Sequence, residues 1–178
     1  MNFEEYNIDL SERATLVSIV CPNFEFHGSQ AATEGSLHEL RELLRTLGVE
    51  TASQHFQNKK KADPATILGE GKLFEIADIA KAEGSNLLVF DFELTASQMR
   101  NIKKITGLEV LDRCMVILEI FARHARTREA KIQIEISRLN YMLPRLQSLW
   151  THFTKQKGGI GLKLSLIHIS EPTRLGMI

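Results

Sequence analysis

Short apolar runs alternate with segments of helical periodicity along the first 112 residues, and this alternation limits the possible folds. Strands are predicted at residues 14–20, 49–57, 87–90 and 109–112. Leu87–Phe90 is a continuous apolar run, typical of a strand that is covered on both faces. Strands that alternate with helices of about 10–15 residues indicate βαβ units. The sequence therefore predicts an α/β fold with a small parallel sheet flanked by helices.

The segments between these runs carry helix signals at both ends. Helices are predicted at residues 34–47, 72–83, 95–105 and 115–124. Thr95 is a typical N-cap residue, because its hydroxyl can accept a bond from a free amide. Gly48 and Gly107 follow the last residues of two helical patterns and are expected to end those helices.

A long helix is predicted from Ala125 to Trp150, and it carries an apolar stripe. Six apolar residues follow one another at alternating steps of four and three: Ile132, Ile136, Leu139, Leu143, Leu146 and Trp150. This spacing places them on one side of the helix, as in a helix that packs against another helix. Pro144 is expected to bend the helix locally. We predict an α/β domain over residues 13–113 and a projecting helical arm over 114–163.

Charge is distributed unevenly along the chain. Residues 1–120 contain 12 Lys and Arg against 19 Asp and Glu, whereas residues 121–164 contain 9 against 2. Basic side chains or histidines recur every seven residues at His124, Lys131, Arg138, Arg145 and His152. A charged surface helix would normally mix the two signs, so the pattern favours a face that contacts phosphates. Aromatic residues are sparse here, which suits the backbone of structured RNA better than stacking on single strands.

The chain lacks a complete phosphate-binding loop. Its nearest fragment contains Gly69, Gly71 and Lys72, but Leu73 stands where a magnesium-binding hydroxyl would be required. Glycines that merely begin a helix explain the fragment more simply. As an alternative function, the α/β domain could bind a nucleotide or another small ligand as an enzyme or sensor, with this fragment at the phosphate and Asp91 at the sheet edge. Loop solvation or helix capping is the simpler explanation for Asp91 and Glu93.

Other functional classes have little support in the sequence. The histidines form no metal-ligand spacing, and Cys21 and Cys114 are isolated, so we predict no metal site and reduced thiols, as in the cytoplasm. The sequence contains no membrane span and no catalytic set of residues.

Several segments resemble the N-terminal region of the HflX-type ribosome-associated GTPases. The similarity covers roughly residues 13–163. The segments are DPATILGEGK (63–72), FDFELT (90–95), VLDR (110–113), ILEIFA (117–122), RTREAK (126–131), LNYMLPRL (139–146) and GGIG (158–161).

This resemblance implies a function in translation. Proteins of this family bind the large ribosomal subunit and help to split or rescue stalled ribosomes, and their two-helix arm carries a glycine-rich tip toward the peptidyl-transferase region. The expected contacts to ribosomal RNA are Arg126, Arg128, Lys131, Arg138, Arg145, Lys155, Lys157, Gly158, Gly159, Gly161 and Lys163. A cytoplasmic monomer is expected for the full-length parent, with GTP and Mg²⁺ as its cofactors.

The sequence departs from the family pattern after Lys163. The family continues there with Gly-Pro-Gly-Glu and a second arm helix, whereas residues 164–178 match neither and are expected to be a non-native tail. The family's GTP-binding motifs are not in the sequence. We therefore expect an N-terminal fragment that has no cofactor of its own and does not hydrolyse GTP alone.

Overall fold

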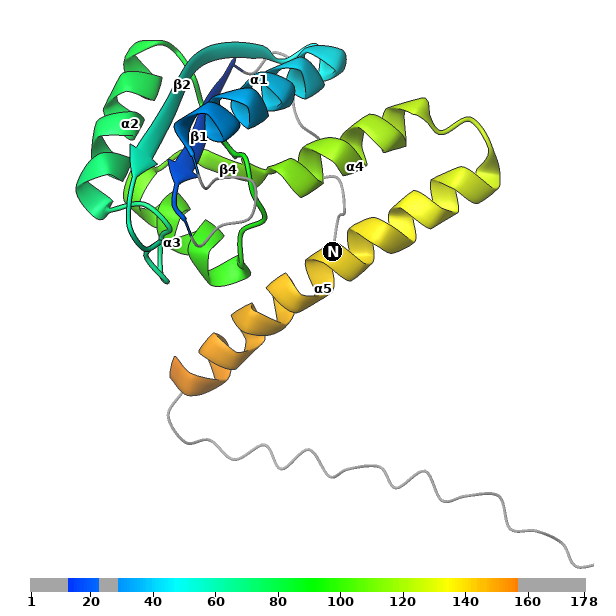
Figure 1. Cartoon of the computed structure of the whole chain (residues 1–178). Coiled ribbons are helices and arrows are strands. Elements are labelled where there is room, and N and C mark those ends of the chain that lie inside the picture. The colour runs from blue at the N-terminus through cyan, green and yellow to red at the C-terminus, as the bar shows by residue number, and fades with distance from the viewer. Residues whose placement is uncertain (1–12, 23–28, 157–178) are drawn as a thin grey trace, which may run out of the picture.

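Four parallel strands form a single sheet at the centre of the molecule. The computed structural model describes residues 13–22 and 29–156, with the side chains of the last helix described as far as Leu143. The strands are β1 (Arg13–Val20), β2 (Glu50–Asn58), β3 (Leu87–Phe90) and β4 (Glu109–Asp112), in the spatial order β2-β1-β3-β4 (Figure 1). The predicted α/β fold with a parallel sheet is confirmed.

Two pairs of helices cover the two faces of the sheet. The helices are α1 (Gln30–Leu47), α2 (Glu70–Ala82), α3 (Ala96–Thr106), α4 (Arg113–His124) and α5 (Arg128–Gln156). The α2 and α3 helices share one apolar cluster with the sheet, while α1 and α4 share the other. The fifth helix, α5, lies outside these layers, where it contacts α3 and α4 (Figure 1).

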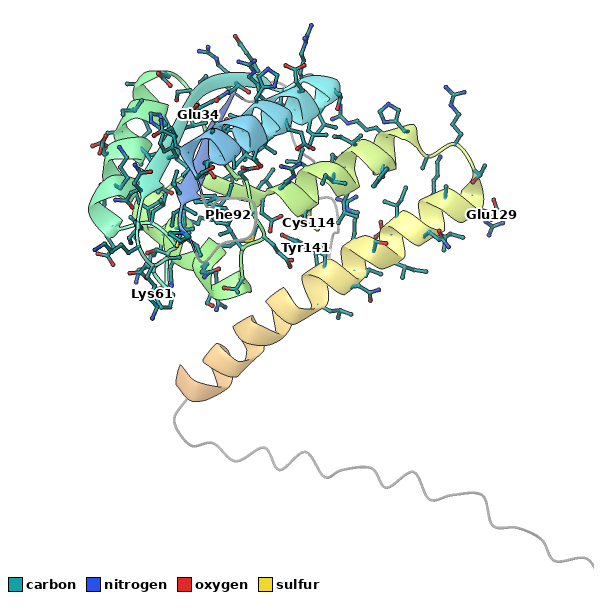
Figure 2. All side chains as sticks on the ribbon, in the orientation of Figure 1. Glu34, Lys61, Phe92, Cys114, Glu129 and Tyr141 are labelled. Atoms are coloured by element: carbon teal, nitrogen blue, oxygen red, sulfur yellow. The ribbon has the colours of Figure 1, made fainter. Side chains whose placement is uncertain are left out.

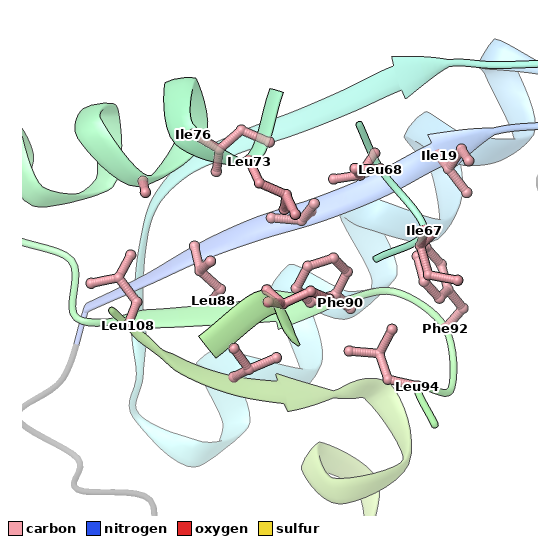
Figure 3. Close-up of a cluster of buried hydrophobic side chains, with 14 of the residues drawn as sticks. Ile19, Ile67, Leu68, Leu73, Ile76, Leu88, Phe90, Phe92, Leu94 and Leu108 are labelled. Carbon is pink, nitrogen blue, oxygen red and sulfur yellow. The ribbon is translucent and has the colours of Figure 1, made fainter. Parts of the chain in front are cut away.

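Neighbouring residues of each buried strand serve opposite faces, as the pleat requires. Val17 and Phe90 face the α2 and α3 cluster shown in Figure 3, which also takes in Leu94 from the loop after β3. Leu16 and Val89 face the α1 and α4 cluster. The strands β1 and β3 are thus buried on both sides, which explains the wholly apolar sequence of β3, while β1 also buries Thr15 and Ser18.

The helix ends follow the local signals, and α1, α2 and α4 begin two to four residues before the predicted starts. Thr95 caps α3 in a reciprocal capping box with Gln98, and the two predicted C-terminal glycines, Gly48 and Gly107, adopt φ angles of 80° and 69°. The first helix begins at Gln30, earlier than predicted, because the Ser29 hydroxyl accepts a 3.2 Å bond from the Ala32 amide. The second helix begins at Glu70, so Gly71 lies inside it.

The long helix begins later than predicted, after a turn. The α4 helix ends at His124, and α5 starts at Arg128, where the Thr127 hydroxyl accepts a 3.1 Å bond from the Ala130 amide. Because α4 contributes the buried Met115 to the core, residues 114–124 pack with the domain; the division at residue 113 stays a prediction. The α5 helix continues through Pro144, and the local bend stays a prediction as well.

Candidate nucleic-acid interface

Three basic side chains gather at the turn between α4 and α5. Arg126 lies in the turn, and Arg128 and Lys131 lie in the first turn of α5; all three are exposed. We call these residues the turn cluster. Among the residues that the structure describes, none of the three side chains has a hydrogen-bonded or ion-paired partner, and the only acid beside them in sequence is Glu129. The turn cluster is therefore a concentrated positive charge that faces solvent.

Arg138 lies in a different environment from the turn cluster. Its side chain is only 18% exposed, and one guanidinium nitrogen lies 3.9 Å from the carboxylate of Glu119 on α4. Glu119 also pairs with Arg123 at 3.8 Å, and Arg123 donates a 2.8 Å bond to the Leu47 carbonyl at the end of α1. The expected row of basic residues along one helix face is thus interrupted, because His124 belongs to α4 and because the Arg138 side chain is turned toward Glu119 on α4.

The apolar stripe of α5 faces solvent over its described length. Ile132, Ile136, Leu139 and Leu143 are 50%, 51%, 37% and 52% exposed. A second stripe faces the domain instead, and its half-buried members are Ala130, Ile134, Arg138 and Tyr141. This second stripe also has helical spacing, a signal in the sequence that the analysis of apolar residues alone overlooks.

Tyr141 and Asp112 connect α5 to the sheet, and the sequence analysis missed both residues. The Tyr141 hydroxyl donates to Oδ2 of Asp112, the last residue of β4 (Tyr141 is labelled in Figure 2). Asp112 is fully buried, and its Oδ1 accepts a 3.1 Å bond from the Met115 amide, so it caps α4. An aspartate immediately before a helix is a capping signal, which could have identified Asp112 from sequence.

At the carboxyl edge of the sheet, Asp91 forms a buried ion pair. Arg113 donates 3.1 Å and 3.0 Å bonds to Asp91 and Ser36, and it pairs with Glu39 at 2.6 Å. Burial lowers the pKa of Arg113, but its bonds to Glu39 and Asp91 outweigh that effect and raise the pKa above its usual value. Asp91 is only 2% exposed, so loop solvation, the simpler explanation, is wrong for this residue, and Thr95 rather than Asp91 caps α3.

The residues predicted to hold a phosphate already have other partners. Lys72 pairs with Glu75 at 2.6 Å, and the Gly69 amide donates a 3.1 Å bond to the Gln57 side chain. Glu70, an acid, occupies the first turn of α2, where it competes with any anion for the helix N-terminus. Nucleotide binding by Gly69, Gly71 and Lys72 stays a prediction that these contacts do not favour.

The remaining predicted RNA contacts lie beyond the described side chains. Arg145 and Lys155 belong to the described backbone of α5 only, and five residues lie outside the described part of the chain: Lys157, Gly158, Gly159, Gly161 and Lys163. The expected non-native tail, residues 164–178, lies there too. Within the described residues, no three metal-binding side chains gather and no helix is long and apolar enough to cross a membrane.

Comparison with known protein families accounts for the two parts of the chain. The family model for the N-terminal region of GTP-binding GTPases matches residues 34–122, half of the chain, and the model for their middle region matches residues 124–166. The chain belongs to the HflX GTPase family. The boundary between the two matches coincides with the end of α4, close to the turn cluster.

Individual HflX relatives match most of this chain but extend well beyond it. GTPase HflX of Flavobacterium psychrophilum is 41% identical over 152 residues, which are 85% of this chain and 36% of the relative. GTPase HflX of Escherichia coli is 38% identical over 161 residues, 90% of this chain and 36% of the relative. The chain thus spans about a third of the length of these relatives.

The fold also matches a solved structure from an archaeon. A GTP-binding protein of Sulfolobus solfataricus, crystallised in complex with GDP, superposes with a TM-score of 0.54 and 29% identity. The match covers 80% of this chain and 42% of the archaeal one.

Proposed function

We propose that this chain is the ribosome-binding part of an HflX GTPase that helps to split or rescue stalled ribosomes. Its arm would contact RNA of the large ribosomal subunit in the cytoplasm. The observation that carries the proposal is the turn cluster, three exposed cations with no described partner, in a chain of the HflX family. GTP and Mg²⁺ would be needed only by the GTP-binding region of the whole protein.

Electrostatics supports contact with phosphates at the turn. No described ion pair has to break before the turn cluster, Arg126, Arg128 and Lys131, can contact RNA. Its full positive charge is therefore available to displace counterions from the phosphates. Arg138 would contribute only after it leaves Glu119. We therefore rank the turn cluster above Arg138. Arg145 and the basic and glycine residues of 155–163 complete the proposed contact surface.

The proposal can be tested by reversing the charge of the turn cluster. The triple variant Arg126→Glu, Arg128→Glu, Lys131→Glu should bind isolated large ribosomal subunits more weakly and with a smaller dependence of affinity on salt. A matched control reverses Lys81 and Lys104, two exposed lysines on α2 and α3. Co-sedimentation at several salt concentrations measures both quantities. Equal affinity and salt slope for the triple variant and the unmodified chain would refute contact through the turn cluster.

The exposed stripe of α5 favours a second function, the binding of a helical partner. Ile132, Ile136 and Leu143 are each half exposed, an unusual density of large apolar side chains on one helix face. Such binding would resist salt, because it depends on apolar burial. Ile136→Asp should abolish it and leave salt-sensitive binding to ribosomal subunits intact, so the two functions can be separated in the same assay.

A further inference from the structure

One carboxylate oxygen joins two parts of the molecule that lie far apart in sequence. Oδ2 of Asp112 accepts a 3.1 Å bond from the Leu94 amide and also the bond from the Tyr141 hydroxyl. Leu94 belongs to the loop between β3 and α3, and Tyr141 belongs to α5. The other oxygen, Oδ1, serves the Met115 amide and so fixes Asp112 to the start of α4.

The loop that holds Leu94 forms the carboxyl edge of the sheet beside the switch in strand order. Leu94 is fully buried and Phe92 is 8% exposed, so both side chains anchor the loop in the core (Figure 3). In the sheet order β2-β1-β3-β4, the chain places β2 on one side of β1 and then β3 and β4 on the other side. The direction in which strands are added therefore switches between β1 and β3. In open α/β sheets, ligands bind near the carboxyl ends of the strands at such a position.

We propose that Asp112 couples the docking of α5 to the closure of this loop, with the Tyr141 hydroxyl as the link. A buried carboxylate is stabilised by each of its donors, because its charge lies in a medium of low polarity. When α5 moves away, water takes the place of the Tyr141 hydroxyl at Oδ2 of Asp112. This water competes with the Leu94 amide for the same oxygen, so opening of the loop at Leu94 becomes more frequent.

The coupling gives the arm a route to the carboxyl edge that does not depend on what the arm binds. A binding partner that displaces α5 near Tyr141 loosens the loop, and a ligand that closes the loop holds α5 in place. The Arg138–Glu119 pair attaches α5 to α4 by a separate contact, since Glu119 also pairs with Arg123, which bonds to the end of α1 rather than to the loop. The coupling requires only that the partner displaces α5 near Tyr141, whether the partner is RNA or protein.

Amide exchange measured by NMR on the full 178-residue chain tests the proposal. Tyr141→Phe removes only the hydroxyl, and we expect the Leu94 amide to exchange about tenfold faster, together with amides of α5 near residue 141. Amides of α1 should keep their rates, because Tyr141→Phe retains the ring that packs against the apolar cluster of α1 and α4. The matched variant Arg138→Gln should speed exchange in the first half of α5 and leave Leu94 unchanged.

Three results would overturn the proposal. An unchanged Leu94 rate in Tyr141→Phe would show that the hydroxyl does not reach the loop. Equal acceleration of Leu94 in Arg138→Gln would show that general loosening of α5, rather than Oδ2 of Asp112, carries the effect. A uniform increase that includes α1 would show that the hydroxyl stabilises the whole domain and has no specific link to the loop.

Discussion

The α/β domain and α5 differ in how far their apolar and charged side chains are covered or paired within the molecule. In the domain, the apolar faces of α1 to α4 are covered by the sheet, and buried acids such as Asp91 and Asp112 receive bonds from nearby donors. On α5, the main apolar stripe is about half exposed and the turn cluster has no described partner. Most large apolar side chains of the domain are therefore covered within it, with Phe74 and Phe121 as exposed exceptions, whereas the sequence of α5 is suited to contacts with another surface.

This contrast also shows how α5 is held. Its described polar attachments are Tyr141 to Asp112 and Arg138 to Glu119, each of which ends on a carboxylate buried in the domain. Polar attachments of this kind break with less loss of buried apolar area than a packed helix interface would. Changes in the domain should therefore alter global stability, and matched changes in α5 should alter local motion or binding.

The largest expected difference concerns apolar side chains. Phe90→Ala should lower the free energy of unfolding by about 3–5 kcal/mol, because Phe90 is fully buried in the core. Ile136→Ala should change it by less than about 0.5 kcal/mol, because the side chain is half exposed. Urea unfolding followed by circular dichroism measures both. A similar decrease in the free energy of unfolding for the two variants would contradict the contrast between the covered core of the domain and the exposed apolar stripe of α5.

A smaller effect is expected from the arginines. Arg113→Met deprives the buried Asp91 of its guanidinium and should cost about 2 kcal/mol, a value discounted because Arg113 is partly exposed. Arg126→Met, in the turn cluster, should leave stability unchanged within about 0.5 kcal/mol. Thermal unfolding at several salt concentrations provides the measurement. A destabilised Arg126→Met would mean that the turn cluster serves the fold rather than binding.

The loss of a helix cap should lower the free energy of unfolding by about 1 kcal/mol more in α3 than in α5. Thr95→Ala removes the capping box of α3 and should lower global stability by about that amount. Thr127→Ala removes the equivalent bond at the start of α5, and because α5 lies outside the cooperative core, we expect only faster amide exchange in its first turn. Hydrogen exchange combined with urea unfolding separates the two outcomes. A loss of global stability in Thr127→Ala would place α5 inside the cooperative unit.

The sequence predicted the domain well because its signals are local. Continuous apolar runs identified the buried strands. The helix ends were identified by residue type alone, through the capping hydroxyl of Thr95 and the glycines Gly48 and Gly107, which adopt positive φ. The start of α5 was predicted three residues early, at Ala125 instead of Arg128, because a single capping hydroxyl at Thr127 is a weak signal beside a long and regular apolar pattern. The alternation of strands and helices indicated a parallel sheet flanked by helices, but it did not predict the strand order β2-β1-β3-β4.

The candidate interface was only partly predictable, because exposure and ion pairing depend on contacts distant in sequence. Composition located the basic region but could not separate exposed Lys131 from Arg138, which meets Glu119 on another helix. The contact of Tyr141 with Asp112 was not predicted, because the spacing between the two residues carries no pattern. Residues that act through long-range pairs are those for which a single sequence gives the weakest signal.

The smallest expected effect concerns His55 on β2, the edge strand of the domain. Burial, followed by the charge of Lys72, holds the pKa of His55 below its usual 6.5. The folded chain then binds fewer protons at this site than the unfolded chain, so stability should fall as pH drops from 6.5 toward the lower folded value. His55→Gln should remove that part of the pH dependence, which amounts to less than about 1 kcal/mol for a partly exposed group. Urea unfolding at pH 7.5 and 5.5 gives the slope, with His38→Gln on the exposed face of α1 as the control. A slope that His55→Gln leaves unchanged, or that His38→Gln removes, would show that the edge strand contributes nothing to the acid sensitivity of the domain.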